Sequence, residues 1–259
     1  AMGELIFAAE QGRNIPKEDK IFGISNRAKK RIAQDGKDKV VNATIGALLD
    51  DDGELIVLSS VTDVFRNLKP EEFAEYAPIA GTAEFREAVK KDAFGIYQPK
   101  GFTEAVATPG GTGAIRNTIS NFSEAGDKIL DADWFWAPYN TIAREIGRSV
   151  ETFELFDDKR KFNIKNFSAK ADSLLEKQER LVIILNTPAH NPTGYALSDE
   201  DWRNVVNYFS SVSKEKKITL LADIAYIDFA GDEEKYRSFL PIIEEAPKNV
   251  LVVIAHSLS

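Results

Sequence analysis

Three short, mainly apolar runs, at residues 181–185, 218–222 and 250–254, constrain the fold of this chain more than any other feature. A strand that is covered on both faces has this pattern, because neither of its faces meets water. Between the runs lie stretches with helical spacing, and the helix that follows Ser198 has a capping-box start with Asp201. The expected strands are 104–108, 128–130, 150–155, 181–185, 218–222 and 250–254, and the expected helices are 113–122, 139–146, 168–178 and the one that follows Ser198.

This alternation predicts an α/β fold with a mainly parallel sheet flanked by helices. We expect residues 1–20 to form an N-terminal arm and residues 21–65 to form the first part of a small α+β domain. Residues 66–259 are expected to form the large domain, which we predict to be incomplete at its C-terminal end.

Local signals predict three features of the first hundred residues. Ser25 is expected to cap a short helix that Gly36 closes, and Thr82 to cap a helix over residues 84–94. Residues 50–53 are expected to form a turn between two short extended pieces. The three aspartates of that turn have no further acidic spacing after them, so we expect a solvated turn and not a metal site.

Composition excludes several classes of function. The formal net charge is −8 and the pI is near 5.0, which argues against a nucleic-acid partner because phosphate binding needs clustered lysine and arginine. The chain has no cysteine and only two histidines, so thiolate catalysis and histidine-rich metal sites are excluded. No apolar run approaches the roughly 20 residues of a membrane span. A cytoplasmic protein without a membrane partner is therefore expected.

Polar residues follow each of the three apolar runs. Asn191 lies shortly after the first run, Asp223 directly after the second, and Ser257 shortly after the third. Ligands of open α/β sheets bind beyond the carboxyl ends of the strands, where these residues are expected to meet. Any one of them alone would be explained as a polar residue that simply ends a strand.

A glycine-rich turn lies between an expected strand and an expected helix. Gly110, Gly111 and Gly113 let the backbone approach an anion, and Thr112 adds a hydroxyl group. No lysine follows as in a P-loop, and Arg116 stands where a dinucleotide fingerprint needs its third glycine. The turn therefore favours the phosphate of a cofactor that is not a nucleotide.

An aromatic cluster spans residues 134–139. Such a cluster is usually part of a core, but its position after a short strand also suits stacking on a flat cofactor ring. The sequence leaves both interpretations open.

In this order, the segments resemble the class I aminotransferases of the aspartate/aromatic branch, which are fold-type I pyridoxal-phosphate enzymes. The similarity spans about residues 40–259. It rests on the glycine-rich turn and on four further segments, Asn191-Pro192-Thr193-Gly194, Asp223-Ile224-Ala225-Tyr226, Ser257-Leu258-Ser259 and Glu75-Tyr76-Ala77-Pro78, with Asn42 to Gly46 as a further match.

The resemblance implies how the cofactor ring is held. Asp223 would keep the pyridine nitrogen protonated, and Asn191 and Tyr226 would bind the ring hydroxyl. Ala225 and Trp136 would pack on the two ring faces. In this family pattern Asp223 and Tyr226 count as catalytic residues.

The resemblance also implies a phosphate site. Gly111, Thr112 and Ser257 would bind the phosphate, and Tyr76 would reach it from the partner subunit of a homodimer. Gly110 departs from the pattern, since the aspartate branch usually carries serine there. We expect this departure to weaken cofactor retention slightly.

For the substrate, the resemblance implicates Gly46, Trp136 and Asn191. It places the Schiff-base lysine directly after Ser259, where this sequence ends. Either the chain is truncated there, or the lysine is left out of the sequence because a covalently bound cofactor makes it a modified residue; we expect the second.

The implied function is transfer of an amino group between an L-amino acid and a 2-oxo acid by a ping-pong mechanism. A β-lyase or decarboxylase with the same cofactor site is the main alternative. A non-catalytic cofactor-binding module is the second alternative, and an unrelated nucleotide-binding α/β protein is the third. The identity of the amino acid stays open, because the expected selector residues follow Ser259 in the family.

Overall fold

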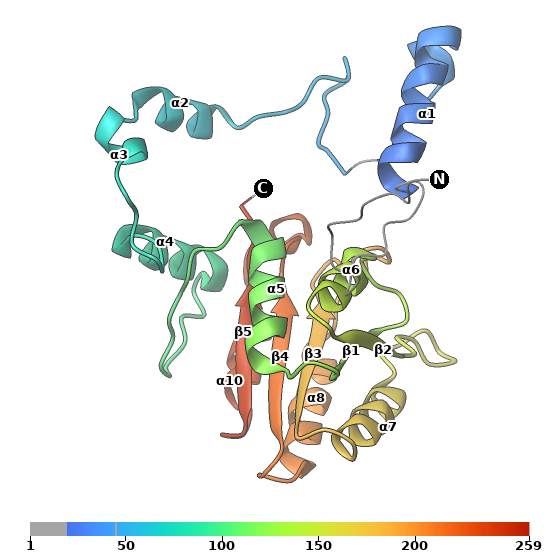
Figure 1. Cartoon of the computed structure of the whole chain (residues 1–259), viewed down its shortest axis with the longest axis vertical. Helices are drawn as coiled ribbons and strands as arrows, with labels where there is room; N and C mark the ends of the chain where they lie inside the picture. Colours follow the sequence, from blue (N-terminus) through green and yellow to red (C-terminus); the bar gives the residue numbers. More distant parts are fainter. Residues whose placement is uncertain (1–19, 45, 259) are drawn as a thin grey trace, which may run out of the picture. The chain divides into compact units, whose positions relative to one another are not determined.

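The computed structural model describes residues 20–44 and 46–258. These residues divide into two compact units between Tyr76 and Ala77, and each unit is described by itself. The unit that begins at Ala77 contains the sheet (Figure 1).

The sheet has five strands, all parallel, in the order β2-β1-β3-β4-β5. This architecture confirms the predicted α/β fold. The strands are β1 (Lys128–Ala132), β2 (Ser149–Phe153), β3 (Arg180–Asn186), β4 (Lys217–Asp223) and β5 (Val250–Ala255).

The runs at 181–185 and 218–222 form the inner strands β3 and β4, whereas the run at 250–254 forms the edge strand β5 and is only partly buried. Helices cover both faces of the sheet (Figure 1). Along β3, Leu181 and Ile183 pack against the helices α7 and α8, whereas Val182 and Ile184 pack against α5 and α6. All four side chains are fully buried, and each contributes about 1.5–3 kcal/mol relative to exposure. The helices of this unit are α4 (Ala83–Phe94), α5 (Gly110–Phe122), α6 (Pro138–Glu145), α7 (Ile164–Leu175), α8 (Asp199–Ser211), α9 (Glu233–Arg237) and α10 (Leu240–Glu244), with a 3₁₀ turn η2 (Ile227–Phe229).

Two predicted helix caps are confirmed. The Thr82 hydroxyl accepts a hydrogen bond from the Phe85 amide at the start of α4. At the start of α8, Ser198 and Asp201 each accept a hydrogen bond from the other's backbone amide, as a capping box requires.

The predicted strand at residues 104–108 is wrong. These residues belong to no strand, and the backbone hydrogen bond made there joins the Ala107 amide to the Ala80 carbonyl. A strand exists only where a neighbouring strand pairs with it, and β5 is the edge strand of the described sheet. Composition alone did not reveal the missing partner.

Two predicted helix starts are also wrong. The helix expected to begin after Ser25 is α1 (Lys20–Asp35), which begins earlier and ends before Gly36 as predicted. The helix expected to begin at Ser168 is α7, because Asn163 caps it by accepting a hydrogen bond from the Asn166 amide at 3.0 Å.

The other compact unit, described from residue 20 to Tyr76, contains α1, η1 (Lys37–Lys39), α2 (Ser59–Asn67) and α3 (Pro70–Ala74). The expected acidic turn is confirmed: Leu49 and Leu55 form an antiparallel bridge around it. The Asp50 carboxylate accepts hydrogen bonds from the amides of Asp52 and Glu54 inside the turn. In residues 20–44 and 46–258 no acidic or histidine cluster suits a metal ion, and no helix is long and apolar enough to cross a membrane.

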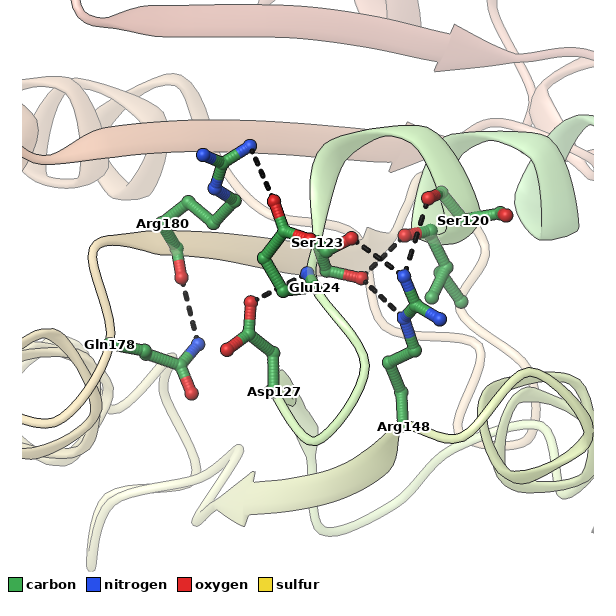
Figure 2. Close-up of polar contacts among 8 residues, drawn as sticks. Ser120, Ser123, Glu124, Asp127, Arg148, Gln178 and Arg180 are labelled. Carbon is green, nitrogen blue, oxygen red and sulfur yellow. Dashed lines mark hydrogen bonds and ion pairs between the residues drawn. The ribbon is translucent and has the colours of Figure 1, made fainter. Parts of the chain in front are cut away.

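At the amino ends of the strands, Arg148 closes the end of α5 (Figure 2). Its guanidinium donates to the Ser123 hydroxyl at 3.0 Å, to the Ser123 carbonyl at 2.7 Å and to the Ser120 carbonyl at 3.4 Å, and also to the Ile146 carbonyl. A cation at this place donates hydrogen bonds to carbonyl groups that have no partner within the helix. Its positive charge also interacts favourably with the negative end of the helix dipole.

A second set of contacts lies at the starts of β1 and β3, and Figure 2 draws those of Gln178 with Arg180 and of Asp127 with Glu124. The Gln178 amide donates to the carbonyls of Lys128 and Arg180 at 2.9 and 2.8 Å. The Asp127 carboxylate accepts from the Glu124 amide at 2.8 Å. The amino edge of the sheet is thus held by structural polar contacts, which leaves the carboxyl edge for function.

We predict that Arg148→Met lowers the free energy of unfolding by about 1–3 kcal/mol, because the carbonyl groups at the end of α5 lose their donor. Urea unfolding followed by circular dichroism measures the change. Arg116→Met is the matched control, since Arg116 makes only an exposed ion pair with Glu145 and should cost at most about 1 kcal/mol. Equal losses in the two variants would contradict the role of Arg148.

Candidate active site

The carboxyl ends of β3 and β4 bring together three of the predicted site residues. Asn186 pairs with Asp223 in the strand register, and its side-chain amide donates to the Asp223 carbonyl at 3.0 Å. The Asn186 side-chain oxygen accepts from the Asn191 backbone amide at 2.7 Å. Asn191 in turn donates to the Tyr226 hydroxyl at 3.4 Å. Asn191, Asp223 and Tyr226 therefore lie in one hydrogen-bonded chain, and Asn186 connects them.

Asp223 is buried, with 5% of its surface exposed. One carboxylate oxygen accepts a hydrogen bond from the Tyr139 hydroxyl, and the other accepts from the Ala225 amide at 3.1 Å. Burial raises the pKa of Asp223 above its usual value, and the two hydrogen bonds act in the opposite direction. Among the described residues no lysine, arginine or histidine pairs with this carboxylate. It is a buried carboxyl group with no cationic partner in the part of the chain that the structure describes.

Tyr139 was not among the predicted site residues. It lies on α6, is 1% exposed and packs edge-on against Trp136, with ring centroids 5.3 Å apart. Burial and the negative charge of Asp223 raise the pKa of Tyr139 far above its usual value, so the phenol stays a neutral donor. The sequence signal that could have indicated it is its place in the aromatic cluster, three residues after Trp136.

The glycine-rich turn meets the end of β5. Helix α5 begins at Gly110, whose φ of 65° suits glycine, and the Thr108 hydroxyl donates to the Gly110 carbonyl. A side chain added at Gly111 would lie 3.5 Å from the Ser257 Cβ, so these two predicted phosphate residues are neighbours. Thr112 is exposed in the first turn of the helix. Amide groups at a helix start, together with a serine hydroxyl, are suited to an anion.

The remaining predicted site residues differ in their surroundings. Ala225 is half-buried, and Tyr226 is exposed beside Asn191. Gly46 and Tyr76 belong to the other compact unit, and their roles stay predictions. Ser259 lies outside the described residues.

Both histidines pair within the fold. His190 Nδ1 lies 2.7 Å from the Thr193 hydroxyl, and burial lowers the pKa of this histidine. His256 Nε2 lies 2.9 Å from the Asp92 carboxylate. These contacts give both histidines a structural role.

The family model for aminotransferase class I and II matches residues 38–259. The chain belongs to the class I and II aminotransferases. This finding confirms the resemblance to the aspartate/aromatic branch. This aminotransferase chain is 29% identical over 235 residues to the mitochondrial aspartate aminotransferase of Arabidopsis thaliana. The aligned region covers 86% of this chain and 52% of the relative. The corresponding Xenopus tropicalis protein is 29% identical over 225 residues, covering 83% and 50%.

Solved structures give the same result. The crystal structure of an aminotransferase from Anaerococcus prevotii has a TM-score of 0.94 and 39% identity, covering 98% of this chain and 63% of that one. The mitochondrial aspartate aminotransferase of Trypanosoma brucei has a TM-score of 0.67 and 25% identity, covering 90% and 60%. The chain spans about half the length of the curated relatives it matches.

The family depends on pyridoxal phosphate, and the residues present fit that group. Asp223 offers a buried carboxylate without a cationic partner, as a protonated ring nitrogen requires. Gly111 lies beside Ser257 at the start of α5, where backbone amides and a hydroxyl group suit a phosphate. The two features lie at ends of neighbouring strands, β4 and β5.

We predict that Tyr139→Phe raises the pKa of Asp223 further, because the carboxylate loses a donor. When the pKa of a buried acid is higher in the folded protein than in the unfolded chain, the free energy of unfolding falls as the pH rises above the unfolded pKa. The folded state must then either bury the charge or keep the proton. The variant should therefore lose about 1–3 kcal/mol at neutral pH and less near pH 4. Urea unfolding at several pH values measures this.

Tyr208→Phe is the matched control for that experiment. It removes a hydrogen bond from a tyrosine to the exposed carboxylate of Asp172. Its cost should stay near 1 kcal/mol and change little above about pH 5. A loss for Tyr139→Phe that does not depend on pH would contradict the account of Asp223.

Proposed function

We propose that this protein is a pyridoxal-phosphate-dependent aminotransferase that moves an amino group between an L-amino acid and a 2-oxo acid by a ping-pong mechanism. The observation that carries the proposal is Asp223, a buried carboxylate with two neutral donors and no cationic partner among the described residues. When bound, the cofactor supplies an electron sink for the negative charge that develops on the substrate Cα.

Asp223 holds a negative charge opposite the ring nitrogen and keeps that nitrogen protonated. Tyr139 and Ala225 support this by fixing both carboxylate oxygens with hydrogen bonds. Because neither donor carries a charge, the cationic ring is the group that balances Asp223.

Two polar side chains bind the ring hydroxyl in this proposal. Asn191 and Tyr226 already contact each other at 3.4 Å beside Asp223, and Asn186 fixes the backbone of Asn191. Ala225 and Trp136 cover the two faces of the ring. Trp136 is supported in this position by its edge-on contact with Tyr139.

The phosphate binds at the start of α5 in this proposal. Gly111 and Thr112 offer backbone amides, and the hydroxyl groups of Thr112 and Ser257 add donors. Tyr76 of the partner subunit completes the phosphate site in a homodimer.

The acid–base step is assigned to the lysine expected directly after Ser259, which moves the Cα proton of the substrate. Gly46, Trp136 and Asn191 are proposed to contact the substrate. The expected cytoplasmic location stays a prediction, because relatives named mitochondrial and cytoplasmic both occur.

We predict that Asp223→Asn lowers the rate of amino transfer by about 10²-fold or more, because the ring nitrogen loses the charge that keeps it protonated. Single-turnover conversion of the bound cofactor to its aminated form by aspartate, alanine or an aromatic amino acid measures the rate through absorbance. Glu200→Gln, which removes an exposed carboxylate on α8, should leave the rate unchanged.

The same assay separates the alternatives. A wild-type protein that binds the cofactor and consumes amino acids without forming the aminated cofactor would be a lyase or decarboxylase. One that binds the cofactor without turnover would be a binding module. Either result would contradict the proposed transfer.

A further inference from the structure

A second carboxyl group is buried near Asp223 and has no part in the proposed reaction. Asp131 lies on β1 and is 2% exposed. One of its oxygens accepts a hydrogen bond from the Ala132 amide at 2.7 Å. The other oxygen is buried without a hydrogen-bond partner among the described residues. An ionised carboxylate in this setting would leave a charged oxygen unsolvated.

Asp131 and Asp223 point to the same side of the sheet. Ile129 and Leu221 both pack in the cluster that contains Tyr139, and side chains two residues further along a strand share that face. Asp131 and Asp223 are those residues on β1 and β4. Tyr139, which binds Asp223, covers them from α6.

No positive charge in the described part of the chain balances the two acids. Among the described residues, the charged group that shifts the pKa of Asp131 is Asp223, and it raises that pKa. The groups whose charges shift the pKa of Tyr139 are Asp223, Asp131 and Tyr226, and all three raise it. The described parts of β2, β3 and α5, which pack around Asp131, contribute no titratable group that acts on it. The negative charge of Asp223 raises the pKa of Asp131, so ionisation of one carboxyl group disfavours ionisation of the other.

The hydrogen-bond donors decide which acid is charged. Asp223 receives a phenol hydroxyl and a backbone amide, one on each oxygen. One oxygen of Asp131 accepts a hydrogen bond from a single backbone amide, and its other oxygen has no hydrogen-bond partner among the described residues. We propose that Asp131 is a positioning residue that carries a proton in the folded protein and thereby keeps the single negative charge of this cluster on Asp223.

Burial raises the pKa of Asp131 well above its usual value, and the negative charge of Asp223 adds to this effect. The location of the proton rests on these contacts alone. The role of this proton in catalysis rests on the proposed function. A single negative charge at Asp223 balances the single positive charge of the ring nitrogen, whereas two carboxylates would leave one negative charge unbalanced.

Infrared difference spectroscopy of the full-length protein tests the proposal. At neutral pH the wild type should show the C=O stretching band of a protonated carboxyl group. Asp131→Asn should abolish this band, whereas Asp223→Asn should keep it. Asp133→Asn is the matched control, because Asp133 is exposed two residues further on and accepts only backbone hydrogen bonds.

Thermal unfolding gives an independent readout. The folded wild type binds a proton at Asp131 that the unfolded chain releases above its ordinary pKa, so its stability falls as pH rises. Asparagine does not titrate, and the midpoint of Asp131→Asn should rise relative to wild type between about pH 4 and about pH 7. A structural defect alone would lower the midpoint equally at every pH.

A band that disappears in Asp223→Asn but persists in Asp131→Asn would overturn the proposal, as would the absence of any such band in the wild type. If Asp131→Asn does not fold, Asp131→Leu, which has the same branched side-chain shape without ionisable oxygens, must also remove the band. A protein that shows the band but transfers no amino group would refute the proposed function and leave the proton on Asp131.

Discussion

The parallel pairing of β3 with β4 is the constraint on which the rest of the site depends. Its register sets Asn186 beside Asp223 at the carboxyl edge of the sheet. A slip of either strand by one residue would turn that strand's polar side chain to the opposite face, away from α5 and α6. The register is fixed because the apolar side chains of both strands fill the clusters on the two faces of the sheet.

From this pairing, the polar contacts extend outward in a defined order. Asn186 holds the backbone of Asn191, and Asp223 binds Tyr139 and the Ala225 amide. Burying Asp223 with neutral donors alone costs stability, and a bound cation would offset that cost. The amino edge of the sheet shows the opposite arrangement, since Arg148 is fully engaged with carbonyl groups (Figure 2). The stabilising contacts of Arg148 and the proposed binding site thus lie at opposite ends of one sheet.

The sequence predicted the central strands well, because a continuous apolar run has few alternatives to a strand covered on both faces. It failed at residues 104–108, because pairing depends on a neighbour that local composition does not show. It also missed Asn163 as a cap, although asparagine is a common residue at that position.

The candidate site shows a similar division. The residues implied by the family resemblance meet where strand ends are shared, as with Asn191, Asp223 and Tyr226. Tyr139 and Asp131 were not predicted, because each acts through a partner far away in the sequence. No spacing rule reports such contacts, since they depend on how α6 packs on the sheet.

The central claim is that Asp223 faces the ring nitrogen of pyridoxal phosphate and keeps it protonated. Nitrogen NMR of the full-length protein, loaded with cofactor labelled at the ring nitrogen, tests this most directly. The account predicts the chemical shift of a protonated nitrogen in the wild type and of an unprotonated nitrogen in Asp223→Asn. An unprotonated nitrogen in the wild type, or the same shift in both proteins, would contradict it.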